Sequence, residues 1–341
     1  MIMMHDNPKA KDARSLIEMI FSFYSSRVIM SAIELKLFDV LHEEAMTGDA
    51  IRDQIGLAER SCFDFLDSLV ALNLLCRDKS GRYENSELAD TWLRSEGDFY
   101  VGGFAEMSEG SLYNVWGKLT ELLKSGEPQL TGRNSFFAKL YENRYAAERF
   151  MNGMDSFNYE ISSTILSSIE GFSPNKILDV GGARGDLLRQ LLTNLPNASG
   201  IVLDLPQVEP LFNDHVTLYG LSSRLTFISG DFREISFPKC DMIIFGHVLH
   251  GVSENIRLEL LIRAFEALNN DGFVCIYDRM IANDRASDPL SLLGSLGMAL
   301  VSPVGSEYTP NNLIELINQA GFMDLYQQNL AATDTLVVAK K

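Results

Sequence analysis

The chain has 341 residues, 46% of them hydrophobic and 22% charged, a composition that excludes an intrinsically disordered protein. Its 46 Asp and Glu residues outnumber its 29 Lys and Arg residues and give a formal net charge of -17. Nucleic-acid backbones and anionic membrane surfaces bind clustered Lys and Arg, so this balance argues against both partners.

The length predicts two domains, at roughly 100–200 residues per domain. The N-terminal segment carries acidic residues and Pro8 where a secretory signal would have an apolar run, and no stretch of about 18 uncharged apolar residues follows. The cysteines form no CxxC pair and stand in apolar sequence: Cys62, Cys76, Cys240 and Cys275. We therefore expect buried, reduced thiols, no zinc site, no membrane segment and a cytoplasmic protein.

Helical periodicity dominates the first half of the chain, from residue 12 to about residue 157. Residues 46–86 add a distinct pattern within it. A short helix, a turn at Gly56, a second helix and two short extended runs around residues 79–82 follow in that order. This succession is typical of a winged helix.

The winged-helix pattern leaves two interpretations of this region. A DNA-binding module would carry basic residues on its second helix, but here that helix carries three acidic residues and one Arg: Glu59, Asp64, Asp67 and Arg60. A scaffold for packing or dimerisation is therefore favoured. We expect residues 1–160 to form a helical, winged-helix-like domain that dimerises and covers the acceptor as a lid.

After Pro174 short aliphatic or β-branched runs alternate with amphipathic helices. The expected strands are 176–180, 200–204, 225–229, 242–246 and 273–277. The expected helices are 187–195 and 254–268, the second capped by Ser253 and stopped at 269–272. Apolar strands joined by helical crossovers predict a doubly wound parallel sheet.

The two extended runs at the C-terminus, 324–330 and 334–340, are separated by a short turn and must pair antiparallel. The expected fold class of residues 161–341 is therefore α/β. We expect a Rossmann-like, seven-stranded, mostly parallel sheet with an antiparallel last strand.

A glycine-rich segment, Asp179-Val180-Gly181-Gly182-Ala183-Arg184-Gly185-Asp186, follows the first expected strand and opens a helix. Glycines at this place let a ligand approach the backbone at the carboxyl edge of the sheet. Asp186 stands where a dinucleotide fingerprint requires a third Gly or Ala, and it would repel a pyrophosphate. Asp179 likewise suits a cation or an amine better than a phosphate, so NAD is disfavoured.

Further acidic residues end the next two expected strands. Asp204 can accept both hydroxyls of a ribose. In Gly230-Asp231-Phe232 the acid can accept from an adenine amine while Phe232 covers the ring. An adenosine with a positive centre and no phosphate is S-adenosylmethionine. Each acid alone is as well explained as a strand-end or helix-capping residue, but four at successive strand ends are not.

The segments DVGGARGD, IVLDLP, SGDF and HVLHGVSEN, after a helical winged-helix-like region, resemble the class I S-adenosylmethionine-dependent methyltransferases. More narrowly, the chain resembles the small-molecule O-methyltransferases represented by plant caffeate and flavonoid enzymes and by bacterial natural-product enzymes. The resemblance covers nearly the whole chain. It implies a homodimer that transfers a methyl group from S-adenosylmethionine to a hydroxyl of a small aromatic molecule of secondary metabolism.

The resemblance also implies the site residues. His250 corresponds to the general base, and the two acids that orient it correspond to Asp278 and Glu307. A histidine with its ordinary pKa near 6.5 suits proton removal at neutral pH. The expected cofactor site comprises Asp179, Gly181, Gly182, Gly185, Asp204, Leu205, Gly230, Asp231, Phe232, Gly246 and His247. No metal is expected.

Several positions depart from the family pattern. Gly251 and Val252 replace the Asp-Trp that follows the base, so aromatic cover of the adenine from that side is missing. Gly246 stands where plant members have a cationic side chain, and Ala183 replaces the middle glycine of the loop. Because the base itself is kept, hydroxyl methylation is favoured.

The acceptor site is expected at the junction of the two domains, where apolar bulk predicts a flat aromatic acceptor. Its expected residues are Trp116, Phe150, Met154, Phe157, Asn158, Leu293 and Met298. Two alternatives stay open at this stage. One is a C- or N-methyltransferase, or a cofactor-retaining enzyme of the same fold that transfers no methyl group. The other is a ligand-responsive winged-helix DNA-binding protein, which the acidic helix disfavours.

Overall fold

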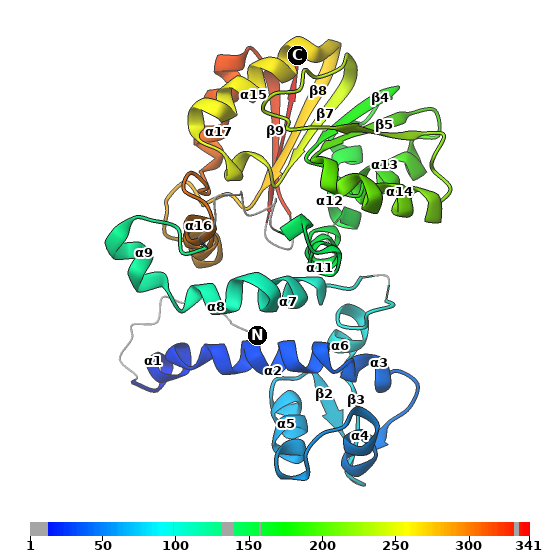
Figure 1. Ribbon diagram of the computed structural model, residues 1–341, viewed down its shortest axis with the longest axis vertical. Coiled ribbons are helices and arrows are strands. Elements are labelled where there is room, and N and C mark those ends of the chain that lie inside the picture. Colours follow the sequence, from blue (N-terminus) through cyan, green and yellow to red (C-terminus); the bar gives the residue numbers. More distant parts are fainter. Residues whose placement is uncertain (1–12, 98, 131–139, 157, 331–333) are drawn as a thin grey trace. The chain divides into compact units, whose positions relative to one another are not determined.

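The computed structural model describes residues 13–97, 99–130, 140–156, 158–330 and 334–341. Two compact units divide the chain, Met1–Glu109 and Gly110–Lys341, and Figure 1 shows both. The boundary expected at residue 160 therefore lies inside the second unit. The apolar side chains of Ile161 and Ile165 pack into the core beneath the large sheet, which is why the helix that carries them belongs with the sheet.

The first unit is a winged helix extended by further helices, as the sequence predicted. Its helices are α1 (Ala13–Ile20), α2 (Ser22–Glu34), α3 (Leu37–Val40), α4 (Gly48–Ile55), α5 (Glu59–Ala71), α6 (Glu87–Trp92) and α7 (Gly103–Met107). Its strands form a small antiparallel sheet in the order β1-β3-β2: β1 (Met46–Thr47), β2 (Leu75–Arg77) and β3 (Arg82–Asn85). Gly56 ends α4 with a left-handed φ of 73°, as the expected turn requires.

Helices α1 and α2 carry a run of exposed apolar side chains. By length and composition alone, Ala13–Glu34 is a helix that could cross a membrane, although only 11% of its most apolar window is buried within the structure. The most exposed large residues are Leu16, Ile17, Met19, Ile20, Phe23 and Tyr24. Uncovered apolar area of this extent on a folded domain marks a surface that another molecule covers.

The second unit is built on a seven-stranded sheet in the order β6-β5-β4-β7-β8-β10-β9 (Figure 1). The strands are β4 (Lys176–Val180), β5 (Ser199–Asp204), β6 (Leu225–Ser229), β7 (Cys240–Gly246), β8 (Leu268–Asp278), β9 (Met323–Asn329) and β10 (Thr335–Lys340). Strands β4 to β8 pair in parallel, and β10 runs antiparallel to both β8 and β9. The mostly parallel sheet with a reversed last strand is thereby confirmed.

Helices cover both faces of this sheet. On one face α15 (Glu254–Ala267) and α17 (Pro310–Ala320) pack against the strands, and on the other face α12 (Asn158–Ser168), α13 (Asp186–Asn194) and α14 (Glu209–Leu218) do so. Leu178 and Ile177, adjacent in β4, point into the two separate cores and are both fully buried. Further α-helices among the described residues of the unit are α8 (Tyr113–Trp116), α9 (Leu119–Ser125), α11 (Arg144–Asp155) and α16 (Pro289–Val301).

Three local expectations need correction. Ser253 occupies the N-cap position of α15 in an extended conformation, but its side chain makes no capping hydrogen bond. Residues 269–272 were expected to end the helix in a loop, but they belong to β8, which begins at Leu268. The pairing of β8 with β7 is irregular at this place. Of the four cysteines, all free, three are buried as expected, whereas Cys76 lies exposed on the wing strand β2.

Candidate active site

The glycine-rich loop leaves the carboxyl end of β4 and begins α13. Gly181 and Gly185 have positive φ values of 73° and 82°. A Cβ on Gly181 would lie 2.6 Å from a methyl group of Val248, and one on Gly182 would lie 2.5 Å from a carboxylate oxygen of Asp179. The backbone of this loop therefore forms a cradle that only glycine leaves open.

Two buried carboxylates flank the cradle. Asp204, at the end of β5, accepts hydrogen bonds from the backbone N–H of Ala183 (2.9 Å) and of Leu205 (2.7 Å), which ties the second strand end to the glycine loop. Burial raises the pKa of Asp204 to about 6. Burial, with the nearby charges of Asp204 and Asp155, raises the pKa of Asp179 to about 7. A positively charged ligand is what such a pair of buried acids favours.

Asp155 is a further acid of this site that the sequence reasoning missed. It lies on α11, where its carboxylate pairs with Arg184 Nε of the glycine loop at 2.5 Å. Burial raises the pKa of Asp155 to about 7. The segment NGMD before Phe157 gives no motif by which spacing alone would have identified this pairing across 29 residues.

Asn158, expected at the acceptor, lies in a polar network at the start of α13. Its amide donates to Asp155 (3.0 Å) and to Asp186 (3.1 Å). Asp186 is also paired with Arg189 and His215. Burial raises the pKa of Asp186, but hydrogen bonds from His215 and Arg189 outweigh it and hold that pKa well below its usual range. Asp186 is therefore a charged structural residue at this helix start.

At the end of β6, Asp231 is held by its neighbour Arg233. The Arg233 Nε lies 2.9 and 3.0 Å from the two carboxylate oxygens, and these hydrogen bonds lower the pKa of Asp231. Gly230 has a φ of 158°, and Phe232 packs partly buried against the sheet core. An adenine amine would have to share Asp231 with Arg233.

Gly246 and His247 end β7. A Cβ on Gly246 would lie 2.1 Å from the ring of Tyr277, so the ring occupies the space that a side chain at position 246 would need. His247 has a positive φ of 53°, and its backbone N–H donates to the Tyr277 carbonyl at 3.0 Å. Its imidazole Nε2 lies 3.0 Å from Asp334 Oδ2.

His250, Asp278 and Glu307 come together from three separate segments. His250 lies on a short turn after β7, Asp278 ends β8, and Glu307 precedes α17. His250 Nδ1 lies 2.9 Å from Glu307 Oε1 and 3.6 Å from Asp278 Oδ1. The second ring nitrogen, Nε2, has no hydrogen-bond partner within the described part of the chain, so it is the nitrogen that can take a proton from a ligand.

The charges around His250 determine its protonation. Burial lowers the pKa of His250, but the charges of Asp278 and Glu307 outweigh it and raise that pKa to about 9. Burial raises the pKa of Asp278 above its usual range, and the two imidazoles act against this effect. The acids therefore favour the imidazolium form, which is the product of proton removal by a histidine base.

Polar contacts fix the position of these acids. The Tyr308 hydroxyl donates to Asp278 Oδ2, and the Arg257 guanidinium lies 4.4 Å from the Tyr308 ring centroid. Arg257 Nε donates to the Leu249 carbonyl at 2.7 Å. The turn that carries His250 and the segment that carries Glu307 are thus held together.

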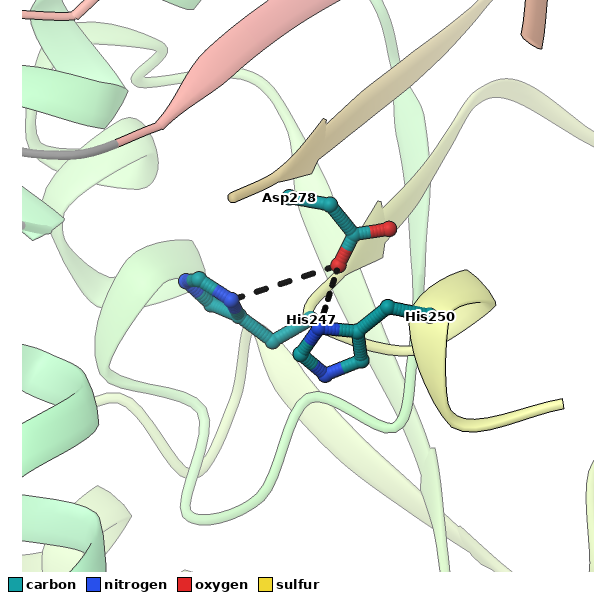
Figure 2. A group of neighbouring side chains, drawn as sticks. All are labelled: His247, His250 and Asp278. Atoms are coloured by element: carbon teal, nitrogen blue, oxygen red, sulfur yellow. Dashed lines mark ion pairs between the residues drawn. The ribbon is translucent and has the colours of Figure 1, made fainter. Parts of the chain in front are cut away.

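Figure 2 shows one carboxylate oxygen of Asp278 facing the imidazoles of both His247 and His250. Their ligand atoms lie within 4.8 Å of one another, a spacing that could hold a metal ion. However, His250 Nδ1 lies at hydrogen-bond distance from Glu307, and a nitrogen that donates a proton cannot also bind a metal. Burial lowers the pKa of His247, but Asp334 raises it above its ordinary value. The contacts of His250 with Glu307 and of His247 with Asp334 thus account for both imidazoles without a metal.

The acceptor residues lie within the second unit, apart from Phe157, which is outside the described residues. Trp116 of α8 packs against Gly297 of α16, and Met298 lies near Gly305. Leu293 is half exposed on α16. Phe150 packs instead against a small buried cluster that Ala183 of the glycine loop also contacts, and Met154 lies on the same helix, α11. Met298 therefore adjoins the segment of Glu307, Trp116 lies against α16, and Phe150 shares a buried cluster with the glycine loop.

Comparison with known proteins gives concordant results. A family described as the O-methyltransferase domain matches residues 116–323, and the O-methyltransferase dimerisation domain matches residues 17–95. The tetracenomycin polyketide synthesis 8-O-methyl transferase TcmO of Streptomyces glaucescens is 36% identical, with 96% of each chain covered. The N,N-dimethyltransferase OxyT of Streptomyces rimosus is 31% identical, again over 96% of each. The crystal structure of human N-acetylserotonin methyltransferase with SAM has the same fold, with a TM-score of 0.89, 23% identity and coverage of 98% of this chain and 99% of that one.

Proposed function

The chain belongs to the O-methyltransferase family, and we propose that it methylates a hydroxyl of a small aromatic natural product with His250 as the general base. One observation carries this proposal: the 2.9 Å contact that turns Nδ1 of His250 toward Glu307 and leaves Nε2 for the acceptor. Two acids on the far side of an imidazole fix its tautomer and increase its basicity.

S-adenosylmethionine is the methyl donor, and it supplies a methyl group on a positively charged sulfur. The residues of the cradle suit this molecule. Gly181 and Gly182 leave room for its approach, and Asp179 and Asp204 place two buried acids where a cation and a ribose are expected. A phosphate-bearing cofactor would be repelled by the same acids.

In the proposed reaction, His250 Nε2 takes the proton of the acceptor hydroxyl. The acceptor oxygen forms a bond to the methyl carbon as the bond from that carbon to sulfur breaks, and S-adenosylhomocysteine leaves. Glu307 and Asp278 hold the resulting imidazolium through its Nδ1–H. The proton then passes to solvent, which restores the base for the next cycle.

We also propose a homodimer through the first unit. The match to the dimerisation domain covers the apolar face of α1 and α2, including Ile17, Ile20 and Phe23, each about half exposed or more. A second copy would bury this face, which also explains an apolar helix here without a membrane.

The related OxyT acts as an N,N-dimethyltransferase by its description, so the acceptor atom must be tested directly. Purified protein is given S-adenosylmethionine with a labelled methyl group and a panel of phenols, anilines and carbon acids. The proposal expects label on oxygen, established by NMR of the product. Label on nitrogen or carbon alone would move the chain to the alternative chemistry, and absence of S-adenosylmethionine binding by calorimetry would overturn both.

A further inference from the structure

Arg279 is a charged residue beside the site that the proposed reaction leaves unused. It follows Asp278 directly, and its side chain is only partly exposed. Its Nε is buried without a hydrogen-bond partner. Within the ranges that the structure describes, the guanidinium makes neither a hydrogen bond nor an ion pair, whereas an arginine this enclosed usually has an anionic partner.

The side chain of Arg279 lies against α16. A Cβ on Gly294 would lie 2.9 Å from Arg279 Cδ and 3.2 Å from Nη1, so the arginine occupies space that only a glycine leaves. One turn further, a Cβ on Gly297 would lie 3.7 Å from Trp116 Cζ2. Residues three apart share a helix face, so Arg279 and Trp116 lie next to each other along α16.

The same helix reaches the catalytic base. Ser295 Oγ, next to Gly294, accepts a hydrogen bond from the backbone N–H of Glu307 at 3.2 Å, and Glu307 holds His250. Arg279 and Trp116 therefore flank a part of α16 that is anchored to the base. A ligand whose ring packs near Trp116 on this face of α16 would therefore lie beside Arg279.

The charges near His250 indicate what the guanidinium of Arg279 could bind. Three carboxylates, Asp278, Glu307 and Asp334, lie against the two imidazoles of His247 and His250, so acids outnumber imidazoles in this cluster even when both rings are protonated. An anionic acceptor beside the cluster therefore needs a further cation. An unpaired guanidinium is a planar, permanently charged donor that binds carboxylates and similar oxygen anions through two hydrogen bonds.

We propose that Arg279 binds an anionic oxygen group of the acceptor, so that the substrates are acidic aromatic molecules, carrying a carboxylate or an ionised enol. This inference rests on the proposed function, because it assumes that the acceptor is held beside α16 and His250. Arg279 is then a specificity-determining residue that touches the acceptor away from the reacting oxygen.

The test measures binding of three probes to the protein saturated with S-adenosylhomocysteine: 3-hydroxy-2-naphthoate, 2-hydroxy-1,4-naphthoquinone and 2-naphthol. The first has a carboxylate, the second an ionised enol, and the third neither. The variants are Arg279→Gln and Arg279→Lys, with Arg285→Gln as the matched control, because Arg285 is an exposed arginine in the following loop.

We expect wild type to bind at least one anionic probe about tenfold or more tightly than 2-naphthol. Arg279→Gln should abolish this preference without changing the affinity for 2-naphthol, Arg279→Lys should keep part of it, and Arg285→Gln should keep all of it. Preference for the naphthoate alone assigns a carboxylate, and preference for the naphthoquinone assigns charge on an enol.

Equal affinity of wild type for all three probes would overturn the inference, as would an unchanged preference in Arg279→Gln. Such a result with intact S-adenosylhomocysteine binding leaves the proposed function standing. Loss of cofactor binding in wild type would instead contradict the proposed function itself, so the two failures are distinguishable.

Discussion

His250 and Glu307 are 57 residues apart in the chain, yet Nδ1 of one lies 2.9 Å from Oε1 of the other. The contact is supported from both sides. The backbone N–H of Ser306 donates to the His250 carbonyl at 2.9 Å, and Arg257 donates to the carbonyls of Leu249 and Ser306. The orientation of the His250 imidazole is therefore part of the fold and does not await a ligand.

Replacing His250 by Ala should lower kcat by about 100-fold or more, because proton removal by a positioned base contributes roughly that factor. Binding of S-adenosylmethionine should stay within about threefold, since the cradle is formed by other residues. Steady-state kinetics and calorimetry measure the two effects. His42→Ala, on an exposed histidine of the first unit, serves as the control. Unchanged turnover in His250→Ala would show that another group takes the proton.

Replacing Glu307 by Gln should move the pH dependence of kcat toward lower pH. Glu307 helps to raise the pKa of His250 to about 9, and the base acts in its neutral form. Removing one negative charge therefore lowers the pKa of His250 and moves the rising limb of the pH profile to lower pH. The plateau value of kcat should also fall, because His250 is then a weaker base and its imidazole is less firmly oriented.

The raised pKa of His250 also affects the stability of the fold, which should fall as pH rises, whereas activity should increase. A folded-state pKa raised above the ordinary 6.5 gives stabilisation that is complete below pH 6.5 and is lost as pH rises through about 9. Thermal unfolding across pH 6 to 10 should show this loss in wild type and a smaller one in Glu307→Gln. A rising limb that stays in place in the variant would argue against Glu307 as the partner of the base.

Replacing Asp179 by Asn should weaken S-adenosylmethionine binding by tenfold or more while raising Tm at pH 8. Burial raises the pKa of Asp179 to about 7, so ionisation of this acid costs stability increasingly as pH rises from its ordinary range through 7. The neutral amide avoids that cost but offers no charge to a cation. Calorimetry and thermal unfolding measure the two effects, and unchanged affinity would remove Asp179 from the cofactor site.

Chelation should leave the activity unchanged. Although His247, His250 and Asp278 are close enough to hold a metal ion, His250 is engaged by Glu307 and His247 by Asp334. We expect protein dialysed against EDTA to retain full kcat/KM, and added Zn²⁺ not to increase it. Loss of activity that Zn²⁺ restores would show that the cluster is a metal centre.

The strand ends could be read from the sequence, whereas their side-chain partners could not. Apolar runs and glycine signals predicted β4 and β6 to the residue, and parallel pairing then placed Asp179 and Asp204 at one sheet edge. Asp155 and Tyr308 could not be predicted because each joins the site through a tertiary contact, Asp155 with Arg184 and Tyr308 with Asp278. These partners are 29 and 30 residues apart in the chain, and a local sequence pattern does not reveal contacts over such distances.

Replacing Gly246 by Ala should lower the unfolding free energy by about 1–3 kcal/mol, the usual cost of overpacking a core. The added Cβ would lie 2.1 Å from the Tyr277 ring, and that ring is almost fully buried beneath the sheet edge. Tyr277→Ala alone removes a buried aromatic ring and should cost about 3–5 kcal/mol. In the double variant the clash is absent, so the cost should be less than the sum of the two single costs, and urea denaturation of all four proteins measures the difference. Strict additivity would contradict the clash between a side chain at position 246 and the Tyr277 ring. A smaller cost in the double variant would show that the Tyr277 ring and a side chain at position 246 exclude each other.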